Sequence, residues 1–96
     1  MKGKTKSGFQ FNIDERILED WRVIDAIGLS ESADASEQLQ GARKLVDLIL
    51  GTEKQKLYDF LTERNNGFVP TTEVVKIVTE IITESKELKN SQSSEG

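Results

Sequence analysis

Residues 74–82 read Val-Val-Lys-Ile-Val-Thr-Glu-Ile-Ile, and this stretch decides the fold class. Its many β-branched side chains favour a strand. Its apolar residues, however, recur at i, i+3, i+4 and i+7 and do not alternate with polar ones. They cover an arc of about 160° on a helical wheel. Because periodicity is the stronger signal, the segment predicts a helix over about residues 72–88, capped by Thr71 or Thr72.

Two helices are predicted in the first half of the chain, each with one apolar stripe. Asp14 is a favourable N-cap for a helix over about residues 14–27, and Gly28 follows as a stop. After a small polar loop, Ser36 is expected to cap a second helix over about residues 37–50.

A third helix is predicted over about residues 53–64, because Thr52-x-x-Gln55 has the form of a capping box. Gly41, inside the second predicted helix, either permits a close helix approach or is simply tolerated. The apolar stripes together predict a core of Ile17, Trp21, Ile24, Val46, Ile49, Leu57, Leu61, Val78 and Ile81.

The ends of the chain are more polar than its centre. Residues 1–7 are predicted to form a flexible basic tail, and residues 89–96 a disordered C-terminal tail. Between the first tail and the first helix, apolar residues alternate with polar ones as in an extended segment. The sequence therefore predicts an all-α protein: a small four-helix domain over residues 8–88 with an extended N-terminal arm and disordered termini.

The composition argues against an enzyme. With 96 residues, the chain has room for one modest core, and a deep substrate cleft beside it is difficult to accommodate. Cysteine and histidine are both absent, which removes thiol nucleophiles, the commonest general base and the commonest metal ligand. Neighbouring carboxylates such as Glu19 and Asp20 point about 100° apart on a helix, so they do not converge. We expect no catalytic residues, no cofactor and no metal.

The charge distribution argues against nucleic acid as a partner. The net charge is −4, and the three lysines in residues 1–7 leave −7 on the rest of the chain. An acidic domain repels phosphate backbones. No apolar run approaches the roughly 18 residues that span a bilayer, and no apolar segment of a signal peptide follows the basic start. A cytoplasmic protein without a membrane partner is expected.

Function is therefore expected to lie in protein binding. Trp21 is interpreted either as a core side chain or as an interface residue, since tryptophan is enriched among binding hot spots. The apolar side of the arm is predicted to contact a partner or a second copy; the alternative is that the arm folds back over its own core. The predicted protein-binding residues are Phe9, Phe11, Ile13, Trp21, Leu48 and Phe68.

Several short segments carry a family resemblance. They lie within residues 8–82 and are Gly8-Phe9, Ile13-Asp14-Glu15, Glu19-Asp20-Trp21, Leu48-Ile49-Leu50-Gly51 and Asn66-Gly67-Phe68-Val69-Pro70. In these segments the chain resembles tail assembly chaperones, small proteins of the tail gene modules of long-tailed (siphovirus-type) bacteriophages of Gram-positive hosts. The family commonly has an acidic residue after the tryptophan, where this chain has Arg22. A charge-mediated contact at that turn is therefore not carried over.

The resemblance implies a role in building the phage tail in the cytoplasm of the infected bacterial host. Such chaperones coat the tape measure protein, keep it soluble and help to recruit the major tail protein. They are absent from the mature virion. A longer form is typically made by programmed ribosomal frameshifting, and this chain would correspond to the short form. The resemblance implies no individual binding residue.

A rival hypothesis is a small acidic phage-encoded regulatory or inhibitor protein that acts by protein–protein binding. It too would be helical and free of chemistry. Gene context separates the two hypotheses, because a chaperone gene lies directly upstream of a very long, tape-measure-like gene.

Overall fold

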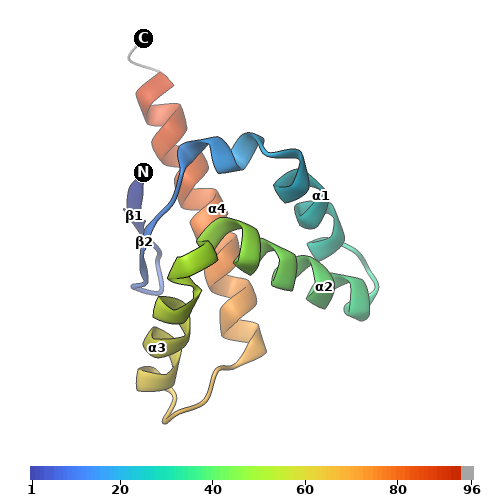
Figure 1. Ribbon diagram of the computed structural model, residues 1–96, viewed down its shortest axis with the longest axis vertical. Helices are drawn as coiled ribbons and strands as arrows, with labels where there is room; N and C mark the ends of the chain where they lie inside the picture. Colours follow the sequence, from blue (N-terminus) through green and yellow to red (C-terminus); the bar gives the residue numbers. More distant parts are fainter. Residues whose placement is uncertain (94–96) are drawn as a thin grey trace.

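The structure, a computed structural model, describes the backbone of residues 1–93 and the side chains of residues 1–88 (Figure 1). Its elements, in chain order, are β1 (Lys2–Lys4), β2 (Gln10–Asn12), η1 (Glu15–Glu19), α1 (Trp21–Ser30), α2 (Ala35–Leu45), η2 (Val46–Leu50), η3 (Gly51–Glu53), α3 (Lys54–Arg64) and α4 (Thr71–Ser93). The segments η1 and η3 are 3-10 helices, and η2 is a π-helix. The chain is therefore mostly helical, as predicted. The simple four-helix domain is wrong, because a two-stranded sheet and three non-α helical segments are also present.

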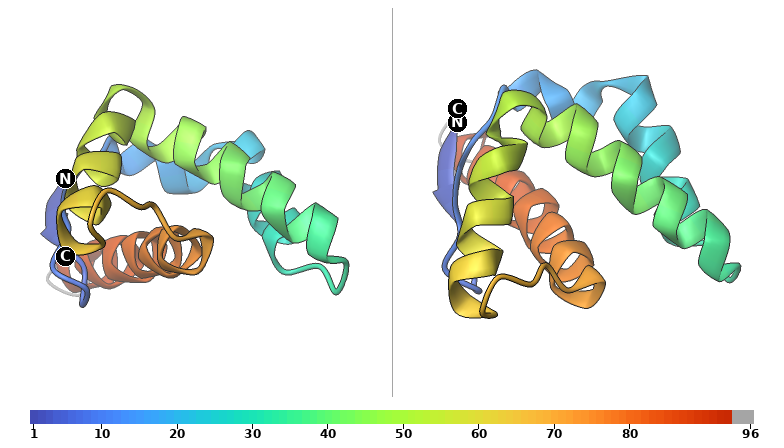
Figure 2. Two further views of the ribbon diagram at one scale, coloured as in Figure 1. Left: turned by 90° about the horizontal axis from the view of Figure 1, so that it is seen from below. Right: turned by 60° about the horizontal axis from the view of Figure 1, so that its bottom comes forward.

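The helix α4 settles the assignment of residues 74–82 in favour of periodicity. Ile77, Val78, Ile81 and Ile82 are all buried on one side of it. Figure 2 shows α4 crossing beneath the α1–α2 pair, with α3 and the β-hairpin together at one end. The predicted end at residue 88 is too early, since α4 continues to Ser93. The predicted disordered tail over 89–96 is thus helical as far as Ser93, and residues 94–96 lie outside the described residues.

The predicted flexible tail over residues 1–7 is wrong, because it supplies a strand. Gly3 of β1 faces Phe11 of β2 in an antiparallel pair. The phenyl ring of Phe11 covers Gly3 so closely that a Cβ there would collide with it. Lysine and glycine are depleted in strands, so Lys-Gly-Lys gave no local signal of one. The hairpin turn is closed by Thr5, whose backbone N–H donates to the carbonyl of Phe9 at 2.9 Å.

The arm folds back over its own core, so the prediction that it offers an apolar side to a partner is wrong. Phe9, Phe11 and Ile13 are 3%, 4% and 5% exposed. The Phe9 ring meets the edge of the Phe60 ring of α3, with centroids 5.5 Å apart. Three apolar side chains at alternate positions, one within β2 and one on each side of it, thus form one side of the main core.

Polar contacts hold the hairpin turn against two helices that are distant in sequence. The backbone N–H and hydroxyl of Ser7 both donate to the Glu80 carboxylate of α4, each at 3.1 Å. The guanidinium of Arg64, in α3, donates to the Ser7 carbonyl at 3.0 Å and lies 5.2 Å from the centroid of the Phe60 ring. These contacts tie the start of the chain to its last two helices.

The predicted helix over 14–27 is two helices with a break at Asp20. Asp20 is extended, with ψ 126°, and its carboxylate caps α1 by accepting from the Arg22 backbone N–H. The break changes the helical phase, so Val23 and Ala26 face the core while Trp21 and Ile24 do not. Trp21 and Ile24 are therefore wrongly assigned to the core, and Ile17 is only half-buried.

Three other local predictions need correction. Gly28 lies inside α1 and does not stop it. Asp34, not Ser36, caps α2 through the backbone N–H groups of Ser36 and Glu37. The capping box at 52–55 is not formed, since the N-cap of α3 is Glu53 and makes no side-chain cap. The remaining predicted core residues are buried, and these are Val46, Ile49, Leu57, Leu61, Val78 and Ile81.

Gly41 permits a close helix approach. A Cβ at this position would lie 2.8 Å from the carbonyl oxygen of Ala26 and from the Cα of Ser30, and closer still to the Ser30 nitrogen. All three atoms belong to the backbone of α1. The α1–α2 pair is therefore in near backbone contact at Gly41, which excludes the alternative that this glycine is merely tolerated.

Candidate protein-binding surface

The structure separates the predicted protein-binding residues into buried and exposed groups. Phe9, Phe11 and Ile13 are in the core, and the half-buried Leu48 packs against it. Trp21 and Phe68, by contrast, are 76% and 65% exposed. They are not brought together: the start of α1 and the α3–α4 connector lie far apart, on different sides of the molecule (Figure 1).

Trp21 forms an exposed apolar patch with Ile24, one helical turn further along α1. Ile24 is 45% exposed. Asp20 and Arg22 flank the tryptophan, and their side chains join in an ion pair of 2.7 Å. The same Asp-x-Arg arrangement occurs one helix earlier, where Asp14 pairs with Arg16, also at 2.7 Å. Each carboxylate caps a helix by accepting from a backbone N–H and also pairs with the guanidinium of the same arginine. These two interactions fix where each short helix begins.

The pKa of Asp20 is lowered from 3.8 to about 2, first by the side-chain hydrogen bonds from Arg22 and then by its backbone N–H. A carboxyl whose pKa is lower in the folded chain than in the unfolded chain stabilises the fold at pH values above its unfolded pKa, here 3.8. That contribution is lost as the pH falls toward 2. We expect Arg22→Gln to raise the Asp20 midpoint in a carboxyl ¹³C NMR titration. Asp14, whose pKa is lowered to about 2 by Arg16, is the control and should not move. An unchanged Asp20 midpoint would contradict the role of the Arg22 side chain.

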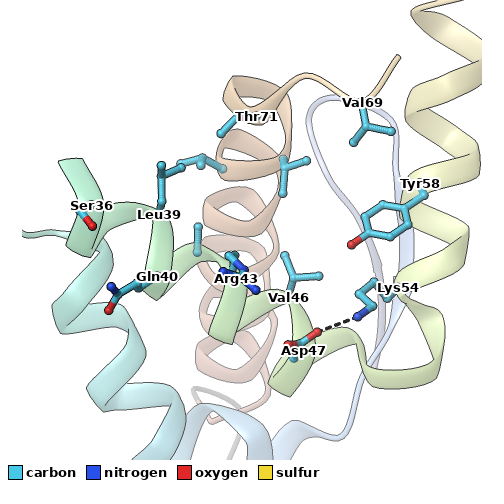
Figure 3. A pocket seen from close by; sticks show the side chains of 13 residues that line it. Ser36, Leu39, Gln40, Arg43, Val46, Asp47, Lys54, Tyr58, Val69 and Thr71 are labelled. Carbon is cyan, nitrogen blue, oxygen red and sulfur yellow. Dashed lines mark hydrogen bonds and ion pairs between the residues drawn. The ribbon is translucent and has the colours of Figure 1, made fainter. Parts of the chain in front are cut away.

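A larger apolar surface is a groove of about 760 Å³ between α2, α3 and the start of α4 (Figure 3). Ligand pockets in proteins commonly have volumes of about 300–1,000 Å³. The side chains that line the groove are Ser36, Leu39, Gln40, Ala42, Arg43, Val46, Asp47, Lys54, Tyr58, Val69, Thr71, Val74 and Val75. Figure 3 shows Leu39 and Arg43 on the α2 side and Tyr58 on the α3 side.

The groove combines apolar walls with a small number of charges. Leu39 of α2 and Val75 of α4 are 48% and 39% exposed, which is high for apolar side chains of this size. Lys54 and Asp47 form an ion pair of 2.8 Å at one end. The side chain of Arg43 makes no hydrogen bond or ion pair within the described part of the chain, so it is the cation of the groove that is free to pair with a ligand.

The α3–α4 connector continues this surface. Asn66 and Gly67 have positive φ values of 54° and 85°, which reverse the chain sharply after α3. Phe68 follows directly and is exposed, while its neighbour Val69 lines the groove. The predicted binding residue Phe68 therefore belongs to the segment that forms one rim of the groove.

The sequence predictions missed Leu39, Val75 and Ile24 as surface residues, because each lies in a helical apolar stripe. One usable signal was present. The predicted 160° arc of the last helix is wider than the face that Ile77, Val78, Ile81 and Ile82 bury, so its margin had to be exposed. A stripe wider than one contact face indicates a second contact face.

Among the described residues, no group of three or more carboxylates, histidines or cysteines is placed to hold a metal ion. Within that same part of the chain, the helices lack the combination of length and apolar character needed to cross a bilayer.

Comparison of the chain with protein-family models, with curated proteins and with solved structures found no match.

Proposed function

We propose that this protein is a tail assembly chaperone of long-tailed bacteriophages, in its short form. In the cytoplasm of the infected host it binds the tape measure protein and helps to recruit the major tail protein, and it does not enter the virion. The observation that carries the proposal is exposed apolar surface on a small, acidic chain. The large exposed hydrophobic side chains are Trp21, Ile24, Leu39, Phe68 and Val75.

The physical requirements of such a chaperone match this surface. Contact with a long helical client needs apolar side chains that are accessible before the client arrives. An acidic exterior, here with a net charge of −4, keeps the coated client in solution by mutual repulsion. Self-association on the client would use the same kind of apolar contact, and we include it in the proposal.

The segments that carry the family resemblance also support the proposal by their positions. Residues 66–70 form the connector that bears Phe68 and supplies Val69 to the groove. Residues 19–21 place Trp21 at the exposed start of α1. Residues 48–50 instead end the π-helix η2, where Ile49 and Leu50 are buried and have a structural role, and the exposed Gly51 begins η3.

Co-expression with the tape measure protein of the same gene module tests this function. We expect the tape measure protein to be soluble and to co-purify with this chain, and to precipitate without it. Combined Trp21→Ser, Leu39→Ser and Phe68→Ser substitutions should reduce co-purification about tenfold or more, because truncating hot-spot residues removes at least 1–2 kcal/mol each. Lys44→Ser, at an exposed polar position of α2, is the control. A tape measure protein that precipitates with or without this chain would reject the proposal.

A further inference from the structure

We infer that the groove between α2, α3 and α4 binds an amphipathic α-helix of a partner protein that carries an acidic side chain opposite Arg43. The inference deepens the proposed function, on which it rests for the source of the helix, a client protein. It is carried by three features of the groove: the length of its α2 wall, the nature of its walls and its single unpaired cation.

The α2 wall is a continuous face about three turns long. Its lining residues Ser36, Leu39, Gln40 and Arg43 belong to α2, and Asp47 lies in the π-helix η2 that continues it. Each is three or four positions from another of the set, which places them along one side. At 1.5 Å per residue this face extends about 16 Å. A partner helix of about eleven residues has the same length. The groove is thus elongated along α2, which suits a helix better than a compact small molecule.

The walls also distinguish a helix from an extended peptide. They are made by side chains of three helices and of the connector that precedes α4. An extended peptide needs backbone partners along its length, such as the edge of a sheet. A helix satisfies its own backbone hydrogen bonds and needs only apolar contacts at i, i+3, i+4 and i+7. Leu39 and Val75, on opposite sides of the groove, supply such contacts.

Charge complementarity identifies the polar residue of the partner. Lys54 and Asp47 neutralise each other, which leaves the groove with the positive charge of Arg43. Within the groove, the Arg43 guanidinium is thus the cation left without a charged partner. A carboxylate on the partner helix can accept two parallel hydrogen bonds from the planar guanidinium of Arg43, whereas a lysine at that position is repelled by the like charge.

Synthetic helical peptides test the inference directly. One 18-residue peptide carries a leucine stripe with one glutamate beside it, and a second has lysine in place of the glutamate. We expect the glutamate peptide to bind about three- to tenfold more tightly in a fluorescence anisotropy titration at low salt. In the Arg43→Glu protein this order should reverse. The reversal is the decisive result, because only a direct pairing at residue 43 produces it.

Substitutions of the apolar walls give a second, independent readout. Leu39→Ser combined with Val75→Ser should weaken binding of the glutamate peptide about tenfold or more, with circular dichroism and thermal midpoint unchanged, since both side chains are exposed. Lys44→Ser combined with Thr79→Ser is the matched control: it changes exposed side chains of the same two helices outside the groove and should leave binding unchanged.

Three results would overturn the inference. The first is binding that is insensitive to Leu39 and Val75, and the second is a peptide preference that Arg43→Glu does not alter. The third is a dimer in sedimentation that only the groove variants dissociate, because the occupant would then be a second copy of this chain. If the groove variants still solubilise the tape measure protein, the groove inference fails and the chaperone function stands. If the peptides bind as expected but the tape measure protein does not bind, the groove inference stands and the chaperone function fails.

Discussion

Phe11→Ala is expected to lower the free energy of unfolding by about 3–5 kcal/mol, the largest effect of any single substitution considered. Phe11 is 4% exposed, packs in the main core and covers Gly3 of the neighbouring strand. Its removal leaves a cavity and also removes the cross-strand contact that holds β1 on β2. A domain of this size has a total stability of about 5–15 kcal/mol, so the variant should be close to unfolding.

Urea denaturation followed by circular dichroism measures this effect. The matched control is Phe68→Ala, which removes the same side chain from a position that is 65% exposed and should change stability by less than about 0.5 kcal/mol. Equal losses for the two variants would contradict the burial of the N-terminal hairpin. A mobile arm would instead predict a negligible effect at Phe11.

Gly41→Ala is expected to destabilise the protein by about 1–3 kcal/mol, although alanine is the better helix former by about 1 kcal/mol. The new methyl group would lie 2.8 Å from the Ala26 carbonyl oxygen and from the Ser30 Cα. Both are backbone atoms, so the clash cannot be relieved by a rotamer change and α1 has to move away from α2. Strain therefore outweighs helix propensity at this position.

Gly28→Ala provides a control of opposite sign. Gly28 is also inside a helix, but it is exposed, and apart from the backbone of its own helix no described heavy atom would lie within 4 Å of a Cβ added there. The same substitution should therefore stabilise the protein by about 0.5–1 kcal/mol through helix propensity alone. Thermal midpoints of the two variants should move in opposite directions, and a common direction would contradict the close α1–α2 contact.

The parts of the fold that the sequence predicted correctly are those where periodicity and burial agree. In α3 and α4 the residues that recur at helical spacing are also buried, as at Leu57, Leu61 and Ile81. The hairpin was not predictable in this way. The strand β1 has no apolar pattern of its own, and it forms because Phe11, seven residues after its end, needs a cover that glycine supplies. Strand pairing of this kind depends on contacts between distant residues, so the local sequence of β1 does not reveal it.

The error at Trp21 has a different physical origin. Ile17, Trp21 and Ile24 match one helical stripe only if a single helix runs through Asp20. An aspartate in that position competes for the backbone, and its carboxylate starts a new helix by accepting from the N–H of Arg22. A pattern of Asp-x-Arg repeated within nine residues was the available sign of two successive caps. A new helix that begins after Asp20 also has a different helical phase, which places Trp21 on the surface.

The candidate groove was largely beyond sequence reasoning. Leu39 and Val75 were correctly placed on helices, but their exposure depends on how far α2 and α4 diverge in space. Phe68 could be identified, because an aromatic side chain directly after Asn-Asn-Gly is forced onto a connector. Arg43 gave no signal, since an unpaired cation is recognised only when its surroundings are known.

The contact between Ser7 and Glu80 has a consequence for synthesis on the ribosome. The two residues are 73 positions apart, so the hairpin is made long before the helix against which it packs. At about 5–20 residues per second, the interval is roughly 4–15 s. During that time Phe9, Phe11 and Ile13 lack the surface that later covers them, and the nascent chain is most prone to aggregation. Completion of the fold is thus a late event that follows the emergence of α4.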